Sequence, residues 1–412
     1  MLFTHVTWIM LLSHASVMIR PHHPSLMIAV VLLSAATRIM AADPPAHATA
    51  SKLPQLSRRV LYNFDGWSCM STKAGGKGPV PVSVDDVKRL IEEVAYEGSR
   101  VDTVLVCINA QVMFYPTKIG TMRGTLSTLE ERANWPASET QLLQNLRAFY
   151  DAGVDPYAIM LAETKRRGRE ALLTFRMNDN HSNDFLRTQF VLDHLDWRLG
   201  TEPYRGKKGA LDFGRSEVRD TIFRLIEEAV RRYDCDGIEL DFNRSPAFFS
   251  DGTTDERVLK MNSLVERVRK MLDDVGRERG RQLVLGVRVP SNFGRTPPTP
   301  DTARQIGCDV AAWVKLGWVD CVTVSEFLLE RGDLPIGLWK QAITTVPVYG
   351  GIECTKGGGG KTLTADEYRD SATQLIKAGA DGVYLFNFFT PREEEVPYEP
   401  PFEVLRDLGS GA

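Results

Sequence analysis

The sequence predicts an α/β fold, a single (β/α)8 (TIM) barrel with long βα loops, and two observations lead to this prediction. Short apolar runs alternate with amphipathic helical stretches from about residue 60 to residue 388. This alternation implies a parallel sheet with right-handed crossovers. Eight such units occur over about 350 residues, which is the unit count of a (β/α)8 barrel. The predicted strands are 60–64, 103–108, 171–178, 234–243, 283–289, 321–325, 346–352 and 382–388.

The intervening stretches show helix signals. Helices are predicted at 84–96, with Ser83 as N-cap, and at 139–152, with Ser138 as N-cap. Further helices are expected at 216–233, 255–277 and 365–379, with one more ending near Trp313. A doubly wound sheet is the competing architecture. It would need a glycine-rich turn after the first strand, and Asp65-Gly66-Trp67-Ser68 does not supply one.

The first residues differ from the rest. We expect 1–42 to be a secretory signal, 43–59 a linker and 60–412 the barrel domain. The apolar run from Met27 follows Arg20 and ends at small residues, and translation starting at Met18 or Met27 would give a signal of ordinary length. A membrane anchor is the alternative, although the run is shorter than the ~20 apolar residues of a membrane span. We therefore predict a secreted or periplasmic protein without stable membrane insertion.

The composition of the chain limits which binding partners and cofactors are expected. The net charge of −3 gives no basic field for nucleic acid, so no nucleic-acid partner is expected. No cofactor or metal site is predicted. The six cysteines form no C-x-x-C pair, and disulfides and buried thiols both stay open. A metal site at His181 and His194 is less favoured than a solvated loop. The Gly357–Thr362 run departs from the P-loop pattern, so no P-loop is predicted there. No G-x-S-x-G motif is present, which disfavours a serine hydrolase.

The fourth predicted strand carries the strongest chemical signal. Its side chains alternate, with Ile238, Leu240 and Phe242 on one face and Glu239, Asp241 and Asn243 on the other. A buried polar face needs partners, or it lines a working site.

The other strand ends are polar as well, and active sites of such barrels lie at the carboxyl ends of the strands. Carboxylates, amides, guanidiniums and aromatic rings together fit a polyhydroxylated ligand. Trp67, Trp135, Tyr115 and Tyr349 could stack on sugar faces. The predicted substrate-binding residues are Asp65, Trp67, Asn109, Arg176, Asn178, Glu239, Asn243, Arg244, Arg288, Tyr349 and Asn387.

The segment Tyr233-Asp-Cys-Asp-Gly-Ile-Glu-Leu-Asp-Phe242 resembles the fourth-strand motif of (β/α)8 glycoside hydrolases. It is similar to the D-G-x-D-x-D-x-E signature of chitinase-type (family 18) enzymes and to the Y-x-x-D-G-I-x-x-D segment of the bacterial glycosyl hydrolase-like 10 group. The close match covers about ten residues. This chain has Asn243 where the chitinase-type motif has its acid, so that mechanism is not carried over.

The resemblance implies a pair of catalytic carboxyls. Asp241 is the expected nucleophile, ionised with help from Arg176, Arg244 or Arg288. Glu326, after the sixth strand, is the expected acid, and Glu353 is the other candidate. For Glu239 we expect chiefly a structural bond to an arginine inside the barrel.

The leading hypothesis is an exported glycoside hydrolase that cleaves a polysaccharide or oligosaccharide, with a carbohydrate substrate as its partner. The alternatives are a non-catalytic carbohydrate-binding barrel, which the amide at 243 favours, and another hydrolase or lyase on the same fold.

Overall fold

The computed structural model describes residues 58–70, 81–126, 133–179, 186–199, 210–291, 300–326, 332–355, 362–393 and 398–409. The predicted signal 1–42, all but the last two residues of the linker 43–59, and the 357–361 glycine run lie outside these residues. Within the described part of the chain, no helix is both long and apolar enough to cross a membrane.

Eight parallel strands close into a barrel in which each strand pairs with its neighbours in sequence, and β1 pairs with β8. This confirms the predicted single (β/α)8 barrel. The strands are β1 (Arg59–Phe64), β2 (Val101–Cys107), β3 (Glu170–Arg176), β4 (Gly237–Asp241), β5 (Val284–Pro290), β6 (Cys321–Ser325), β7 (Val348–Glu353) and β8 (Gly382–Phe386).

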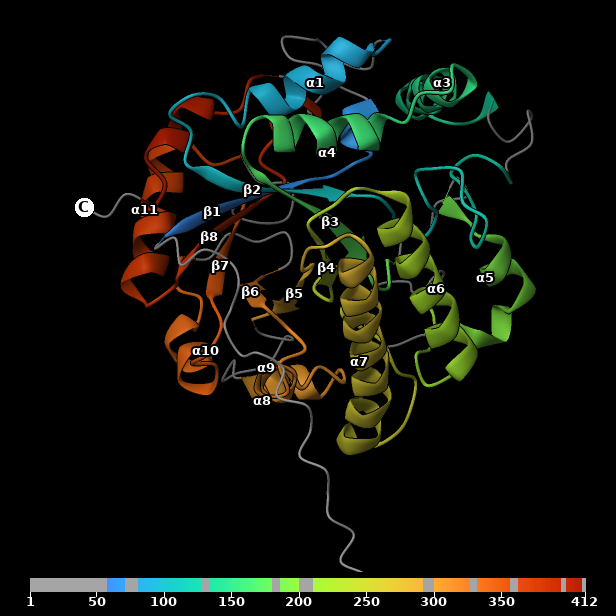
Figure 1. Cartoon of the computed structure of the whole chain (residues 1–412), viewed down its shortest axis with the longest axis vertical. Helices are drawn as coiled ribbons and strands as arrows, with labels where there is room; N and C mark the ends of the chain where they lie inside the picture. Colours follow the sequence, from blue (N-terminus) through green and yellow to red (C-terminus); the bar gives the residue numbers. More distant parts are fainter. Residues whose placement is uncertain are drawn as a thin grey trace, which may run out of the picture. The chain divides into compact units, whose positions relative to one another are not determined.

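Helices surround the strands, with α10 and α11 on one side of the view in Figure 1 and α6 and α7 on the other. The described α-helices are α1 (Val84–Glu92), α3 (Ala137–Asp151), α4 (Pro156–Arg166), α5 (Gln189–Asp193), α6 (Ser216–Arg232), α7 (Thr254–Glu278), α8 (Pro300–Arg304), α9 (Val310–Lys315), α10 (Ile336–Ala342) and α11 (Ala365–Lys377). Short 3-10 turns are η1 (Ser68–Met70), η3 (Leu195–Trp197), η4 (Thr390–Glu393) and η5 (Phe402–Arg406).

Helix starts follow from capping chemistry. Ser83, Thr253 and Thr364 each form a capping box with the acidic residue three positions later, at the starts of α1, α7 and α11. Ser83 was predicted. The prediction of Ser138 as a cap is wrong, because α3 begins at Ala137 after Pro136 and has no side-chain cap.

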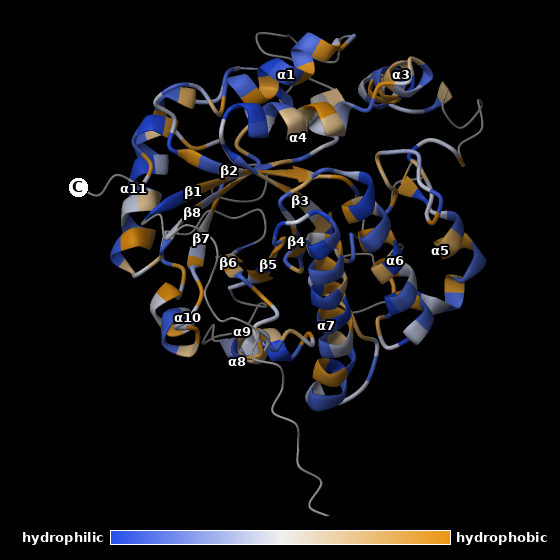
Figure 2. Ribbon diagram, viewed as in Figure 1, coloured by the Kyte–Doolittle hydropathy of each residue, from blue (hydrophilic) through white to orange (hydrophobic). Residues whose placement is uncertain are grey.

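Alternation on the strands separates two apolar layers. Residues such as Val60, Ile238 and Leu240 point outward and form the core between barrel and helices. Inward residues, including Leu61, Leu105 and Leu172, fill the inside of the barrel. The helices in Figure 2 are hydrophobic on one side and hydrophilic on the other, as this packing requires. The inward polar residues of β4 therefore lie inside the barrel, as expected.

Candidate active site at the carboxyl ends of the strands

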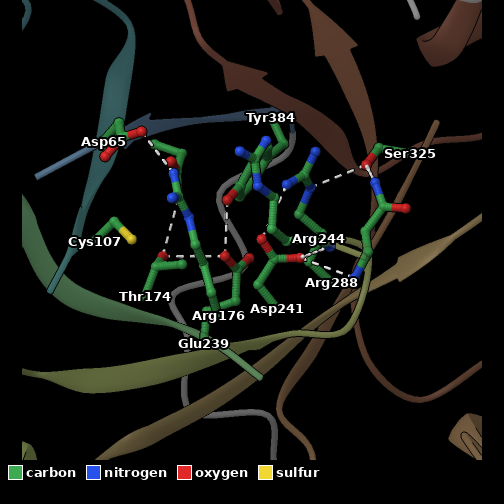
Figure 3. Close-up of polar contacts among 12 residues, drawn as sticks. Asp65, Cys107, Thr174, Arg176, Glu239, Asp241, Arg244, Arg288, Ser325 and Tyr384 are labelled. Carbon is green, nitrogen blue, oxygen red and sulfur yellow. Dashed lines mark hydrogen bonds and ion pairs between the residues drawn. The ribbon is translucent and has the colours of Figure 1, made fainter. Parts of the chain in front are cut away.

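Because all eight strands are parallel, their carboxyl ends meet at one end of the barrel. In the strand register, Asp241 of β4 lies between Arg176 of β3 and Arg288 of β5. In Figure 3, Arg288 reaches Asp241 and Ser325, whereas Arg176 reaches Asp65. The barrel thus brings carboxylates and guanidiniums from separate stretches of sequence into one cluster.

Asp241 is fully buried and accepts three hydrogen bonds. Its Oδ1 accepts from the backbone N–H groups of Asn243, at 2.9 Å, and Arg244, at 3.1 Å. Its Oδ2 accepts from Nη1 of Arg288 at 3.2 Å. The backbone that follows β4 therefore orients this carboxylate, and Arg288 neutralises its charge.

Arg288 links three inward residues from three strands. Besides Asp241, its Nη2 donates to Oε1 of Glu353 at 2.8 Å, and its Nε donates to Oγ of Ser325 at 3.0 Å. Its guanidinium carbon lies 3.8 Å from the centre of the Phe386 ring. Burial lowers the pKa of Arg288, but the carboxylates, Asp241 foremost, raise it above its ordinary value. Arg288 thus stays a cation between two predicted catalytic carboxyls.

Glu239 lies one inward position before Asp241 on β4. Its Oε1 accepts hydrogen bonds from the Tyr384 hydroxyl, at 2.7 Å, and from the Thr174 hydroxyl, at 3.1 Å. The prediction that Glu239 bonds an arginine is therefore wrong, because Tyr384 and Thr174 donate to its carboxyl instead. Burial, followed by repulsion from Asp241, raises the pKa of Glu239 to about 7. Near neutral pH this carboxyl is therefore partly protonated and partly ionised.

A second charged group lies beside the first and is built on Arg176 at the end of β3. Its Nη2 donates to Oδ2 of Asp65 at 2.6 Å, and its Nη1 donates to Oδ2 of Asp179 at 3.2 Å. Nε of Arg244 lies 3.7 Å from the same oxygen of Asp179. Burial pushes the pKa of Asp65 upward, but Arg176 outweighs it and the pKa falls below its ordinary value. Burial and repulsion from Arg176 lower the pKa of Arg244.

Glu326 directly follows β6 and is half-buried. Its Oε1 accepts a hydrogen bond from the hydroxyl of Ser291, which directly follows β5. The three predicted catalytic carboxyls thus come from the ends of β4, β6 and β7.

Two predicted amides bind the backbone. Asn109 accepts from the N–H of Arg176 at 2.9 Å and donates to its carbonyl at 3.0 Å, which fastens the end of β2 to β3. Asn178 accepts from the N–H of Leu211 and donates to the carbonyls of Leu211 and Ala247. Both side chains hold loops at the rim. Contact with substrate stays a prediction for each.

The predicted aromatic residues occupy different environments. Tyr115 is fully buried against Tyr233, and its hydroxyl bonds Glu228. The Arg123 guanidinium carbon lies 3.4 Å from the centre of the Trp67 ring, so a cation covers one face of that ring.

Tyr349 is the second residue of β7 and lies inside the barrel with Leu61, away from the strand end where we expected it. Asn387 follows β8, is half-buried and has a left-handed backbone with φ of 57°. Trp135 is half-buried before α3.

Thr174, Ser291, Tyr384 and Phe386 belong to the cluster and were not predicted. Period-two alternation carries a usable signal for three of them. Thr174 has the parity of Arg176, and Tyr384 and Phe386 share one face of β8. Ser291 carries no such signal, because it lies beyond the strand end.

Among the described residues, no group of three or more His, Cys, Asp or Glu side chains is arranged to hold a metal ion. His194 stacks on Trp197, with ring centres 3.7 Å apart, and His181 lies outside the described residues. Cys107, Cys235, Cys308, Cys321 and Cys354 are buried free thiols, which confirms that alternative for these five.

A closed parallel barrel with carboxylates and guanidiniums at the carboxyl ends of its strands has its charged cluster where (β/α)8-barrel enzymes have their active sites. The model of the glycosyl hydrolase-like 10 family matches residues 102–260, a span that includes all but the first residue of β2, the whole of β3 and β4, and the motif around Asp241. This match confirms the resemblance to that family. The search of curated proteins finds no match.

Solved structures share the fold. The glycoside hydrolase domain of PgaB (BpsB) from Bordetella bronchiseptica is 12% identical, with a TM-score of 0.51, and the match covers 85% of this chain and 98% of that one. The α-L-fucosidase isoenzyme 2 from Paenibacillus thiaminolyticus is 11% identical, with a TM-score of 0.51, and the match covers 86% of this chain and 49% of that one. At these identities the likeness establishes the barrel fold.

Proposed function

We propose that this chain is an exported glycoside hydrolase that cleaves a polysaccharide or oligosaccharide, with Asp241 and Glu326 as its catalytic carboxyls. The observation that carries the proposal is the setting of Asp241. It lies at the end of β4, where two backbone N–H groups and Arg288 fix its carboxylate. A charged, oriented carboxylate is what attack at a sugar carbon requires.

The second carboxyl must keep a proton to donate to the leaving oxygen. Glu353 is less suited to this role than Glu326, because Arg288 donates to Glu353 and a nearby cation favours the charged form of a carboxyl. Glu326 directly follows β6, and it accepts a hydrogen bond from the neutral hydroxyl of Ser291. We therefore assign Glu326 as the acid.

Substituting the pair tests the proposal. Asp241→Asn and Glu326→Gln preserve side-chain shape, and each should lower the release of reducing sugar from a glycan panel by about 10²-fold or more. Asp274→Asn and Glu278→Gln, both on α7, are matched controls that should keep parental activity. Folded Asp241→Asn and Glu326→Gln proteins with parental activity would end the assignment.

A second candidate is a non-catalytic carbohydrate-binding barrel. Asp241 has an exposed fraction of 0%, and both of its oxygens accept hydrogen bonds inside the protein. An amide also occupies position 243, where chitinase-type proteins have an acid. This candidate predicts that the parent binds glycans in the same panel and releases no product.

The N-terminal assignments belong to the same proposal. Residues 1–42 would direct export and be removed, 43–59 would link, and 60–412 would fold as the barrel in a secreted or periplasmic location. N-terminal sequencing of the protein recovered from an expressing bacterium tests this, and an intact Met1 in the cell interior would contradict it.

A further inference from the structure

We propose that Asn243 and Ser325 together bind one hydroxyl group of a neutral sugar, next to Asp241. The proposal rests on the proposed function, because it assumes a carbohydrate ligand, and it specifies which class of sugar the site takes. Asn243 and Ser325 would be specificity-determining residues, since they recognise the ligand and take no part in bond cleavage.

Asn243 carries a buried acceptor that the protein leaves unused. Its side chain is fully buried, and its Nδ2 donates to Oγ of Ser325 at 2.9 Å. No described residue donates to its Oδ1. Buried amide oxygens are almost always hydrogen-bonded, because leaving one without a donor costs free energy. A missing donor at the end of β4 indicates a ligand position.

Ser325 supplies the complementary donor. Its Oγ accepts from Nε of Arg288 and from Nδ2 of Asn243, and these two bonds use both lone pairs of the oxygen. The hydroxyl hydrogen must therefore be donated elsewhere, and within the described ranges no acceptor is found for it. Gly351 leaves the space that this side chain occupies, because a Cβ on residue 351 would lie 2.2 Å from the Ser325 Cβ.

One unused acceptor beside one unused donor is the complement of a hydroxyl group. A hydroxyl can donate to Asn243 Oδ1 and accept from Ser325 Oγ at the same time. A carboxylate has no hydrogen for Oδ1. The N–H and C=O of an acetamido group point in opposite directions across a planar trans amide, so one such group cannot meet both. At this position the pair therefore favours a sugar that presents a hydroxyl group over one that presents a carboxylate or an acetamido group.

The pair also places this hydroxyl next to the proposed nucleophile. The backbone N–H of Asn243 donates to Oδ1 of Asp241 at 2.9 Å, and Arg288 contacts both Asp241 and Ser325. The next two residues, Arg244 and Ser245, are only partly buried, so the chain passes from the buried pair to solvent within two residues.

Direct binding of monosaccharides tests the inference. The full-length parent is titrated with D-glucose, D-galactose, D-mannose and D-xylose, and separately with D-glucuronate, D-galacturonate and N-acetyl-D-glucosamine, by ligand-observed NMR. We expect at least one neutral sugar to bind more tightly than every acidic or N-acetylated sugar. Asn243→Ala and Ser325→Ala should each weaken that binding by about tenfold, the loss expected for one or two hydrogen bonds. Ser263→Ala, on the exposed side of α7, is the matched control.

Three results would overturn the inference: no binding of any neutral sugar, tighter binding of an acidic or N-acetylated sugar, or unchanged binding in folded Asn243→Ala protein. The second result would mean that Asn243 presents its Nδ2 to the ligand, and the third that an ordered water meets Oδ1. The sugar preference of the parent stays informative if a variant does not fold.

The proposed function fails separately. Neutral sugars bound through Asn243 without any glycan hydrolysis would refute the hydrolase and keep the hydroxyl-binding pair. Glycan hydrolysis by the parent, together with sugar binding that Asn243→Ala leaves unchanged, would support the hydrolase and refute the hydroxyl-binding pair.

Discussion

Arg288 and Asp241 form an ion pair in which both side chains have an exposed fraction of 0%, with 3.2 Å between Nη1 and Oδ2. A buried pair of this kind gains little over an apolar pair, but removing one partner leaves an uncompensated charge in the interior. Here the loss of Arg288 would leave two carboxylates, because Glu353 shares the same guanidinium.

Arg288→Met should therefore lower the free energy of unfolding by about 3–5 kcal/mol, measured by urea denaturation at pH 7. Arg277→Met is the control, because Arg277 is 77% exposed and its pair with Asp274 is worth less than about 1 kcal/mol. The double variant Arg288→Met/Asp241→Asn should recover part of the loss, since it removes one of the stranded charges. Equal stability of Arg288→Met and Arg277→Met would contradict this account.

The carboxyl of Glu239 should make stability depend on pH. Its folded pKa of about 7 lies above the ordinary value of 4.5, so the folded protein binds more protons than the unfolded chain between these values. Stability should therefore fall as pH rises from 4.5 to 7. The contribution of this group is up to about 3 kcal/mol, and it levels off at higher pH.

Glu239→Gln removes this ionisation and still accepts hydrogen bonds from Tyr384 and Thr174. Its unfolding free energy relative to the parent should increase across the same pH window. Asp65 does not interfere, because its lowered pKa confines its own effect to pH values below about 4, the range of a free Asp. A stability difference between Glu239→Gln and parent that is constant with pH would rule out this titration.

The fold was predictable because its signals are local. Period-two alternation placed Glu239 and Asp241 on the inward face of β4, and both lie inside the barrel. The Ser83 cap was readable from its neighbours alone. The helix α4 went unpredicted although Asp155 caps it and Pro156 opens it, a pattern that does mark helix starts.

The site was predictable only in outline, because its pairings are not local. Arg288 meets residues 47 and 65 positions away, and the stagger of the closed barrel decides which carboxylates it reaches. Tyr349 shows how sensitive such placement is. Its strand begins at Val348, after Pro347, so Tyr349 lies near the start of β7 and Glu353 at its end.

Gly351 on β7 should be essential for the position of Ser325. A Cβ at residue 351 would lie 2.2 Å from the Cβ of Ser325, far inside van der Waals contact, so Gly351→Ala must displace one strand or the serine. We expect Gly351→Ala to lower the free energy of unfolding by about 1–3 kcal/mol and to weaken sugar binding as Ser325→Ala does.

Gly337→Ala is the matched control for Gly351→Ala. Its new Cβ would meet only the Ala378 carbonyl oxygen, at 3.8 Å, and alanine should stabilise α10 by about 0.4–1 kcal/mol. The double variant Gly351→Ala/Ser325→Gly removes the clashing atoms, so it should regain the stability lost in Gly351→Ala while binding sugar no better. Regained sugar binding in this double variant would show that the Ser325 hydroxyl is not the donor. An unchanged unfolding midpoint in Gly351→Ala would show that β6 and β7 can separate locally.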